Sequence, residues 1–225
     1  MKHEERKSIY LVTMISKFFL NAITNIDSCY SGVYATEIIK LEPHHLGTTA
    51  SVNTITTQIT QPLWGYLSDL KGIRKYFTAI GYIITGLMVA LTFQLKTYLS
   101  YILITSAVWI FWSGAYACWQ ALIGDLTVKM GRGKIIGYLG LAGNLGGMFS
   151  SLLAGQIIDR WGYGMISTIC LIFGILAAIP ILTIKEKKEP LEKKRKKRVS
   201  WRETTSEYKR YLIIMTIWWG IMSIP

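Results

Sequence analysis

Charged side chains are missing from long parts of this sequence. The stretches Leu46–Ser68 and Tyr76–Leu95 contain no Asp, Glu, Lys or Arg, and three more such runs follow at 97–124, 135–158 and 161–184. Each run is long enough to cross the hydrocarbon core of a bilayer, which takes about 20 helical residues. A soluble domain of this size would have to bury several helices that are apolar on every face. The absence of charge therefore argues against a soluble fold and predicts an all-α membrane protein.

Cysteine is scarce as well, with three residues at Cys29, Cys118 and Cys170. Their spacing fits neither a disulfide framework nor a metal site, so we interpret them as small packing residues. The sequence has no histidine cluster, no glycine-flanked serine nucleophile and no paired catalytic acids within the apolar runs. Its segment 131–134 lacks the spacing of a phosphate-binding loop. We therefore expect no enzyme activity, no metal, no cofactor and no ATP-driven step.

Basic residues outnumber acidic ones, 25 to 13, and their placement predicts the orientation in the membrane. Lys and Arg gather before the first apolar run and in the connections after the second and fourth runs. The connections on the opposite side hold only Lys40, Lys96 and Arg160. Because cytoplasmic loops carry the excess of Lys and Arg, we predict a multi-pass protein of the plasma membrane with a cytoplasmic N-terminus.

A strongly basic segment follows the sixth helical run, and residues 193–198 read KKRKKR. Such a run can bind nucleic acid. A cytoplasmic connector that contacts anionic lipid headgroups fits a membrane protein better, and we expect no nucleic-acid partner. The predicted organisation is a bundle of six membrane-spanning helices in residues 1–184, a basic linker in 185–209 and the start of a seventh helix in 210–225.

A short charged segment between the second and third runs is the most informative feature. It extends from Gly65 to Lys75 and places Asp69, Gly72 and Arg74 in what we predict to be a tight turn at the membrane surface. Residues 155–162 repeat the Gly, Asp and Gly of this segment after a shift of 90 positions. Three crossings separate the copies, so the second copy should face the other side of the membrane. This predicts two three-helix units related by inversion, an arrangement typical of secondary transporters.

The first of these segments resembles the signature loop between helices two and three of the major facilitator superfamily of transporters. The matching positions are Gly65, Leu67, Asp69, Gly72, Arg74 and Lys75. The segment Ile123–Gly137, with Asp125 and Arg132, resembles the connection between helices four and five of that family. The resemblance covers about residues 8–184 and implies a six-helix bundle built of two inverted three-helix repeats, followed here by the start of a seventh helix.

The resemblance also implies a role for the charged loops. Asp69, Arg74 and Asp125 would form a latch that holds the cytoplasmic side shut until the bundle rocks. The alternative is a set of ordinary surface ion pairs, each worth ~0–1 kcal/mol.

The sequence departs from common family patterns at two places. Thr105 or Ser106 stands where many members have an arginine in helix four, and Ser150-Ser151 replaces the Gly-Pro pair that proton-coupled drug antiporters have in helix five. Both departures count against a standard proton-driven drug exporter.

The first predicted helix is the only one that places charged residues within a span. On a helix of 100° per residue its polar side chains share one face. These are Tyr10, Thr13, Lys17, Asn21, Thr24, Ser28 and Ser31, with Asn25 and Asp27 at the edges. A lysine that faced lipid would cost a few kcal/mol, so this polar stripe should face other helices or a watery cavity.

The two charges of the stripe, Lys17 and Asp27, are separated by about 15 Å along the helix axis. They therefore cannot pair directly. One interpretation is that Asp27 takes a coupling proton or a cationic group while Lys17 takes an anionic or hydroxyl-bearing group. The other is that each side chain extends to its nearer membrane surface.

The second and fourth helices supply further candidates. Gln58 and Gln61 share a face of the second helix, where they either contact a solute or join helices. Trp109, Trp112, Tyr116 and Trp119 follow one flank of the fourth helix, where they either line a cavity for sugar rings, aromatic solutes or organic cations or pack against lipid and core. The candidate solute or ion site is therefore Lys17, Asn21, Thr24, Asp27, Ser28, Gln58, Gln61, Trp112 and Tyr116.

The fifth helix carries small residues at every fourth position, namely Gly143, Gly147, Ser151 and Gly155. Such a ridge permits close approach of a neighbouring helix. We expect it to serve packing and rocking of the bundle.

Together these features predict a secondary active transporter that moves a small solute by alternating access, coupled to H+ or Na+. Family members have twelve helices, and this sequence ends about 15 residues into the seventh apolar run. We therefore expect an amino-terminal half whose missing bundle is encoded separately or supplied by a second copy. The alternatives are a half-transporter that needs a partner bundle and a non-transporting assembly or sensor subunit.

Overall fold

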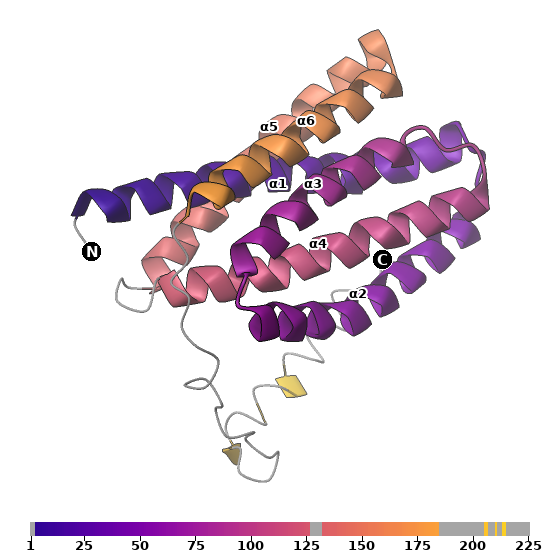
Figure 1. The fold of residues 1–225 in the computed structure, drawn as a ribbon. Coiled ribbons are helices and arrows are strands. Elements are labelled where there is room, and N and C mark those ends of the chain that lie inside the picture. The colour runs from indigo at the N-terminus through magenta and orange to yellow at the C-terminus, as the bar shows by residue number, and fades with distance from the viewer. Residues whose placement is uncertain (1–2, 127–131, 185–204, 207–209, 211–212, 215–225) are drawn as a thin grey trace. The chain divides into compact units, whose positions relative to one another are not determined.

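The computed structural model describes residues 3–126 and 132–184, together with the short pieces 205–206, 210 and 213–214. Contacts divide the chain into two units, residues 1–188 and 189–225, and the helices described below lie in the first. They are α1 (His3–Glu37), α2 (Pro43–Lys71), α3 (Arg74–Thr92), α4 (Tyr98–Leu126), α5 (Arg132–Trp161) and α6 (Tyr163–Thr183), as Figure 1 shows. The predicted all-helical bundle of six helices is confirmed for these residues. The predicted basic linker and seventh helix lie outside them except for these short pieces.

Five of the six helices are long and apolar enough to cross a membrane: α1 from Ile9 onward, α3, α4, α5 and α6. The exception is α2, which has 29 residues but is rich in threonine and contains glutamine and asparagine. Its length would span the bilayer, whereas its composition alone would not identify it as a span. The crossing of α2 therefore remains a prediction, which is supported by its packing along α4.

The helices alternate in direction because their described connections are short. The N-terminal end of α1 and the α2–α3 turn lie at one end of the bundle (Figure 1). The end of α6 belongs to the same side, since the Lys75 ammonium at the start of α3 donates a hydrogen bond of 3.2 Å to the Ile184 carbonyl just after α6. This arrangement agrees with the side assignments made from the basic residues.

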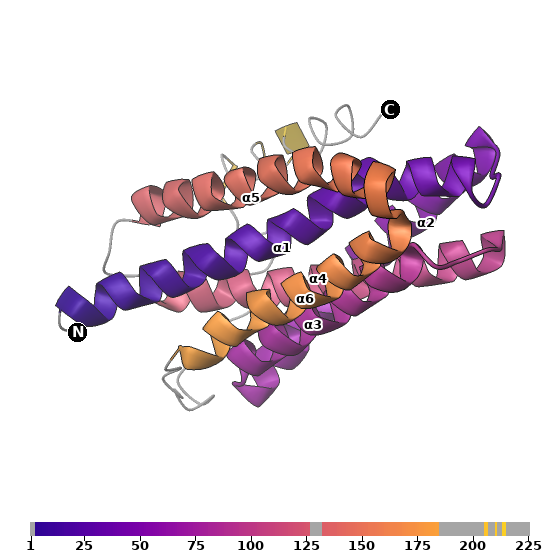
Figure 2. The same cartoon turned by 90° about the horizontal axis from the view of Figure 1, so that it is seen from above.

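The helix pairs follow a regular pattern. Helix α1 packs on α5 and α6, and helix α4 packs on α2 and α3, so each of these contacts joins one of the first three helices to one of the last three. The remaining major contact joins α3 to α6 (Figure 2). If α1 is exchanged with α4, α2 with α5 and α3 with α6, each of these five helix pairs becomes another pair of the same set, or itself.

Helices α3 and α6 touch at two glycines. A Cβ added to Gly86 would lie 2.8 Å from the Cys170 carbonyl oxygen, and one added to Gly174 would lie 3.1 Å from the Tyr82 carbonyl oxygen. The crossing is therefore reciprocal, and it depends on the absence of side chains at both positions.

The small-residue ridge of α5 packs against α1, as predicted. A Cβ on Gly143 would meet the Asn21 amide, and one on Gly147 would meet the Asn25 amide at 2.5 Å. Further along, the Tyr30 hydroxyl donates a hydrogen bond of 2.8 Å to the Ser151 carbonyl. Part of the polar stripe of α1 is thus used for helix packing.

The two predicted turns are much shorter than the sequence suggested. Residues 65–71 continue α2 and residues 155–161 continue α5, so most of each charged segment is helical. The chain leaves each helix at one glycine with a positive φ, Gly72 at 60° and Gly162 at 75°. The Gly72 amide bonds to the Ser68 carbonyl, and the Gly162 amide bonds to the Ile158 carbonyl. Gly72 is in the left-handed helical region, with ψ at 28°, whereas Gly162 has an extended ψ of 179°. Glycine adopts a positive φ in either region without a steric penalty, which is why both helices end at the second glycine of the motif.

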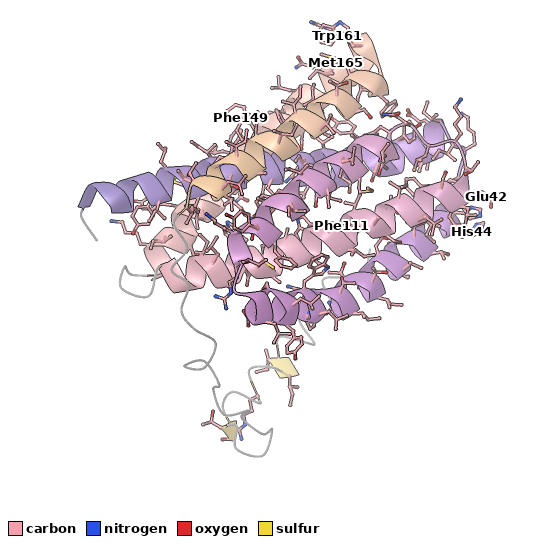
Figure 3. All side chains as sticks on the ribbon, viewed as in Figure 1. Glu42, His44, Phe111, Phe149, Trp161 and Met165 are labelled. Carbon is pink, nitrogen blue, oxygen red and sulfur yellow. The ribbon has the colours of Figure 1, made fainter. Side chains whose placement is uncertain are left out.

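Polar contacts join helix α2 to α4, and two of them involve hydroxyl groups. The Ser106 hydroxyl donates to the Asn53 side-chain oxygen at 3.0 Å, and the hydroxyls of Thr60 and Ser113 lie 3.0 Å apart. Beside them an apolar cavity of about 270 Å3 separates α2 from α3, with Phe111 of α4 in its wall (Figure 3).

The outer surface of α5 and α6 is apolar. Phe149, Trp161 and Met165 are exposed and project away from the bundle (Figure 3). Such a surface suits contact with lipid chains.

Candidate functional site

The fourth helix presents a ladder of aromatic rings. Trp112 and Tyr116 are stacked with centroids 5.2 Å apart and an interplanar angle of 6°, and Tyr116 stacks on Trp119 at 6.1 Å. Trp109 continues the ladder with an edge-on contact of 5.2 Å to Trp112. The rings meet because residues three and four apart share one face of a helix.

Lys17 of α1 lies over one end of this ladder. Its ammonium nitrogen is 5.1 Å from the ring centre of Tyr116 and 4.9 Å from that of Trp119. A desolvated cation over aromatic faces gains about 2 kcal/mol or more, which offsets part of the cost of placing a lysine inside a membrane span. The sequence predicted an aromatic flank suited to cations, and in this structure the cation on the ladder is the protein's own.

Asp27 lies beside the other end of the ladder. Its side chain is 7% exposed, and its Oδ1 atom has no hydrogen-bond partner among the residues that the structure describes. A small cavity of about 20 Å3 adjoins it, lined by Thr24, Asp27, Ser28, Val89, Val108, Trp109 and Trp112. The helix brings Thr24, Asp27 and Ser28 together because they are three and four residues apart.

The structure therefore gathers six of the nine predicted solute or ion residues into two neighbouring groups along α1 and α4. One group is Lys17 with Tyr116, and the other is Thr24, Asp27 and Ser28 with Trp112. The two groups are joined by the stack of Trp112 on Tyr116.

The other three predicted residues lie elsewhere. Asn21 packs on Gly143 of α5 and accepts a hydrogen bond of 2.9 Å at its carbonyl from the Asn25 amide. Gln58 is exposed on α2 and Gln61 is half-buried there. Neither glutamine lines the cavity beside Asp27.

The sequence reasoning missed Trp109, Val89 and Val108 as cavity-lining residues. Trp109 was seen as part of the aromatic flank but was not included in the predicted site. The valines carried no signal, since an apolar residue in an apolar helix looks the same in a cavity wall as in the core.

The loop at the end of α2 contains one ion pair. The Arg74 guanidinium donates to the Asp69 carboxylate, with Nε 3.0 Å from Oδ1, across the turn at Gly72. Asp69 is more than half exposed, so the pair is accessible to water. Asp125 and Arg132 lie at the end of α4 and the start of α5, and their side chains are outside the described residues. The third member of the predicted latch is therefore not placed.

The described residues contain no group of three or more His, Cys, Asp or Glu side chains arranged to hold a metal ion. The geometry thus offers a buried acid, a half-buried base and aromatic rings between them inside a helical bundle. Groups of these kinds can bind and orient a solute.

Comparison with known proteins points in the same direction. The family model described as "Major Facilitator Superfamily" matches residues 9–225. An uncharacterized MFS-type transporter, YuxJ of Bacillus subtilis (strain 168), is 23% identical over 220 residues, which are 92% of this chain and 53% of that protein. The chain thus spans about half the length of the curated relative that it matches.

Proposed function

This chain belongs to the Major Facilitator Superfamily, and we propose that it forms the solute-binding wall of an ion-coupled permease that works by alternating access. Family membership makes it a membrane transporter and not an enzyme. The observation that carries the proposal is the pairing of Lys17 and Asp27 of α1 with opposite ends of the aromatic ladder of α4.

Buried charges in a membrane span are costly and are usually kept for function. Asp27 has no ion-pair partner among the described residues. The ammonium group of Lys17 lies over the rings of Tyr116 and Trp119. Asp27 therefore takes the coupling ion, H+ or Na+, or a positive group of the solute. Lys17 takes an anionic or hydroxyl-bearing group once it leaves the ladder.

The bundle is proposed to consist of two inverted three-helix repeats. Two observations support this. The helix contacts are unchanged when the halves are exchanged, and the glycine caps at Gly72 and Gly162 repeat the same hydrogen bond after a shift of 90 residues. Related repeats give a bundle two similar ways of packing, which suits alternating access.

The cytoplasmic latch is proposed at the α2–α3 turn, where Asp69 pairs with Arg74. Asp125 and Arg132 would join it from the α4–α5 connection. The distribution of basic residues supports a plasma-membrane protein with a cytoplasmic N-terminus. A second bundle, either separate or from another copy, would close the polar faces of α1 and α2 and complete the passage.

The test is transport in proteoliposomes that contain the purified protein with a second bundle, either co-reconstituted or supplied by another copy, measured as counterflow of radiolabelled solutes from a broad panel. Asp27→Asn and Lys17→Ala are assayed beside Asp159→Asn, a matched acid-to-amide change at an exposed position of α5. We expect the first two changes to reduce flux, and Asp27→Asn to alter its pH or Na+ dependence, with no effect of the third.

Flux and ion dependence that are the same in all three variants would refute the site. Solute binding without counterflow would favour a non-transporting sensor or assembly subunit.

A further inference from the structure

The cavity beside Asp27 has a composition that selects one class of solute. Its wall combines one carboxylate, two hydroxyls, two tryptophans and two valines. The carboxylate is more than nine-tenths buried and its Oδ1 lacks a protein partner. From this combination we propose that the solute is a primary organic amine, whose ammonium group binds Asp27. The inference deepens the proposed permease function and rests on it.

A positively charged occupant of this cavity would stabilise the ionised carboxylate of Asp27. A buried carboxylate is costly unless it is paired or hydrogen-bonded. Lys17 cannot be the cationic partner of Asp27, because it lies about 15 Å away along the axis of α1. Its ammonium group lies over Tyr116 and Trp119 instead. The described residues place no other cation against Asp27, so the partner comes from outside these residues.

The size of the cavity limits the charged group. About 20 Å3 is space for one water-sized group. A primary ammonium fits this space and brings three N–H donors, which match the Asp27 carboxylate and the hydroxyls of Thr24 and Ser28. Thr24 donates its own proton to the Asn21 carbonyl at 3.2 Å, which leaves its oxygen lone pairs as acceptors. A quaternary ammonium has no N–H donor and is too large.

The walls favour an organic cation over Na+. Tryptophan is the aromatic side chain that attracts ammonium groups best, and both Trp109 and Trp112 line the cavity. A hard inorganic cation prefers a shell of oxygen ligands, whereas most of this wall is carbon. Ser28 is exposed and gives the cavity an open side, through which the rest of the amine can extend away from Asp27.

The experiment measures binding of tritiated 2-phenylethylamine to the full chain in lipid nanodiscs by scintillation proximity, at one pH. Asp27→Asn and Trp109→Ala are compared with Trp109→Phe and with Asp159→Asn as the matched control. Unlabelled tetramethylammonium and NaCl serve as competitors. Size-exclusion profiles and melting curves of each variant check that it is folded.

We expect saturable binding that Asp27→Asn weakens by about tenfold to a hundredfold and Trp109→Ala by about fivefold. Trp109→Phe should retain most of the affinity, and Asp159→Asn all of it. Neither tetramethylammonium nor NaCl should displace the amine at concentrations where unlabelled 2-phenylethylamine does.

The inference is overturned if the folded wild-type protein does not bind the amine, if folded Asp27→Asn binds it equally well, or if NaCl or tetramethylammonium competes as effectively. These outcomes leave the permease function intact when counterflow of another solute is observed. Amine binding with no flux of any solute, also when a second bundle is supplied, would instead refute the permease function and leave the amine site standing.

Discussion

The glycine crossing of α3 and α6 gives the sharpest test of the packing. Replacing Gly86 by alanine adds a Cβ that would lie 2.8 Å from both the Cys170 carbonyl oxygen and the Gly174 Cα. Both are backbone atoms, so the two helices have to move apart. Overpacking of this kind costs about 1–3 kcal/mol, and the better helix propensity of alanine offsets about 0.5–1 kcal/mol of it. We expect Gly86→Ala to lose about 1–2 kcal/mol of stability in total.

The measurement is unfolding of the purified protein in mixed micelles with increasing SDS, followed by circular dichroism. Gly140→Ala is the matched control, because a Cβ at this position of α5 meets nothing within 4 Å. It should leave the stability unchanged or raise it slightly. If Gly86→Ala behaved like Gly140→Ala, the close crossing of α3 and α6 would be wrong.

Three further results are expected. Gly72→Ala and Gly162→Ala should each lower stability in the same SDS titration by about 1–2 kcal/mol, because both residues have a positive φ; a cost at one position only would argue against equivalent turns. Lys75→Met should remove the hydrogen bond to the end of α6 and lower stability by about 1 kcal/mol, and an unchanged unfolding curve would show that this contact contributes nothing. In a cysteine-free background, Asp69→Cys and Asp159→Cys should react with a membrane-impermeant maleimide from opposite sides of oriented vesicles, and labelling from one side would contradict the inverted repeat.

The helices themselves were predictable because a membrane span needs about 20 apolar residues without charge, and such a run can be read directly from the sequence. Runs without charge predicted five of the six helices, and α1 was predicted from an apolar run that includes Lys17 and Asp27. The length of the turns was overestimated because Asp69 and Lys71 are compatible with the last turn of a helix at the membrane surface. Only the φ of Gly72 shows where the helix ends.

The partners of each polar residue were harder to predict. Helical periodicity says which face a residue occupies, but not which helix that face meets. The sequence therefore could not predict that Asn53 bonds to Ser106 of α4 or that Thr60 bonds to Ser113 of α4. In the same way, the position of Lys17 on the polar stripe was evident, whereas its contact with Trp119 depends on how α1 and α4 cross.

The hydrogen bond from Lys75 to Ile184 has a mechanical consequence. The basic segment of the chain begins directly after Ile184, and Lys75 adjoins Arg74, which is bonded to Asp69. The Ile184 carbonyl is therefore tied both to α6, which ends next to it, and to the start of α3. A displacement of Ile184 would act on the α2–α3 turn as well as on α6.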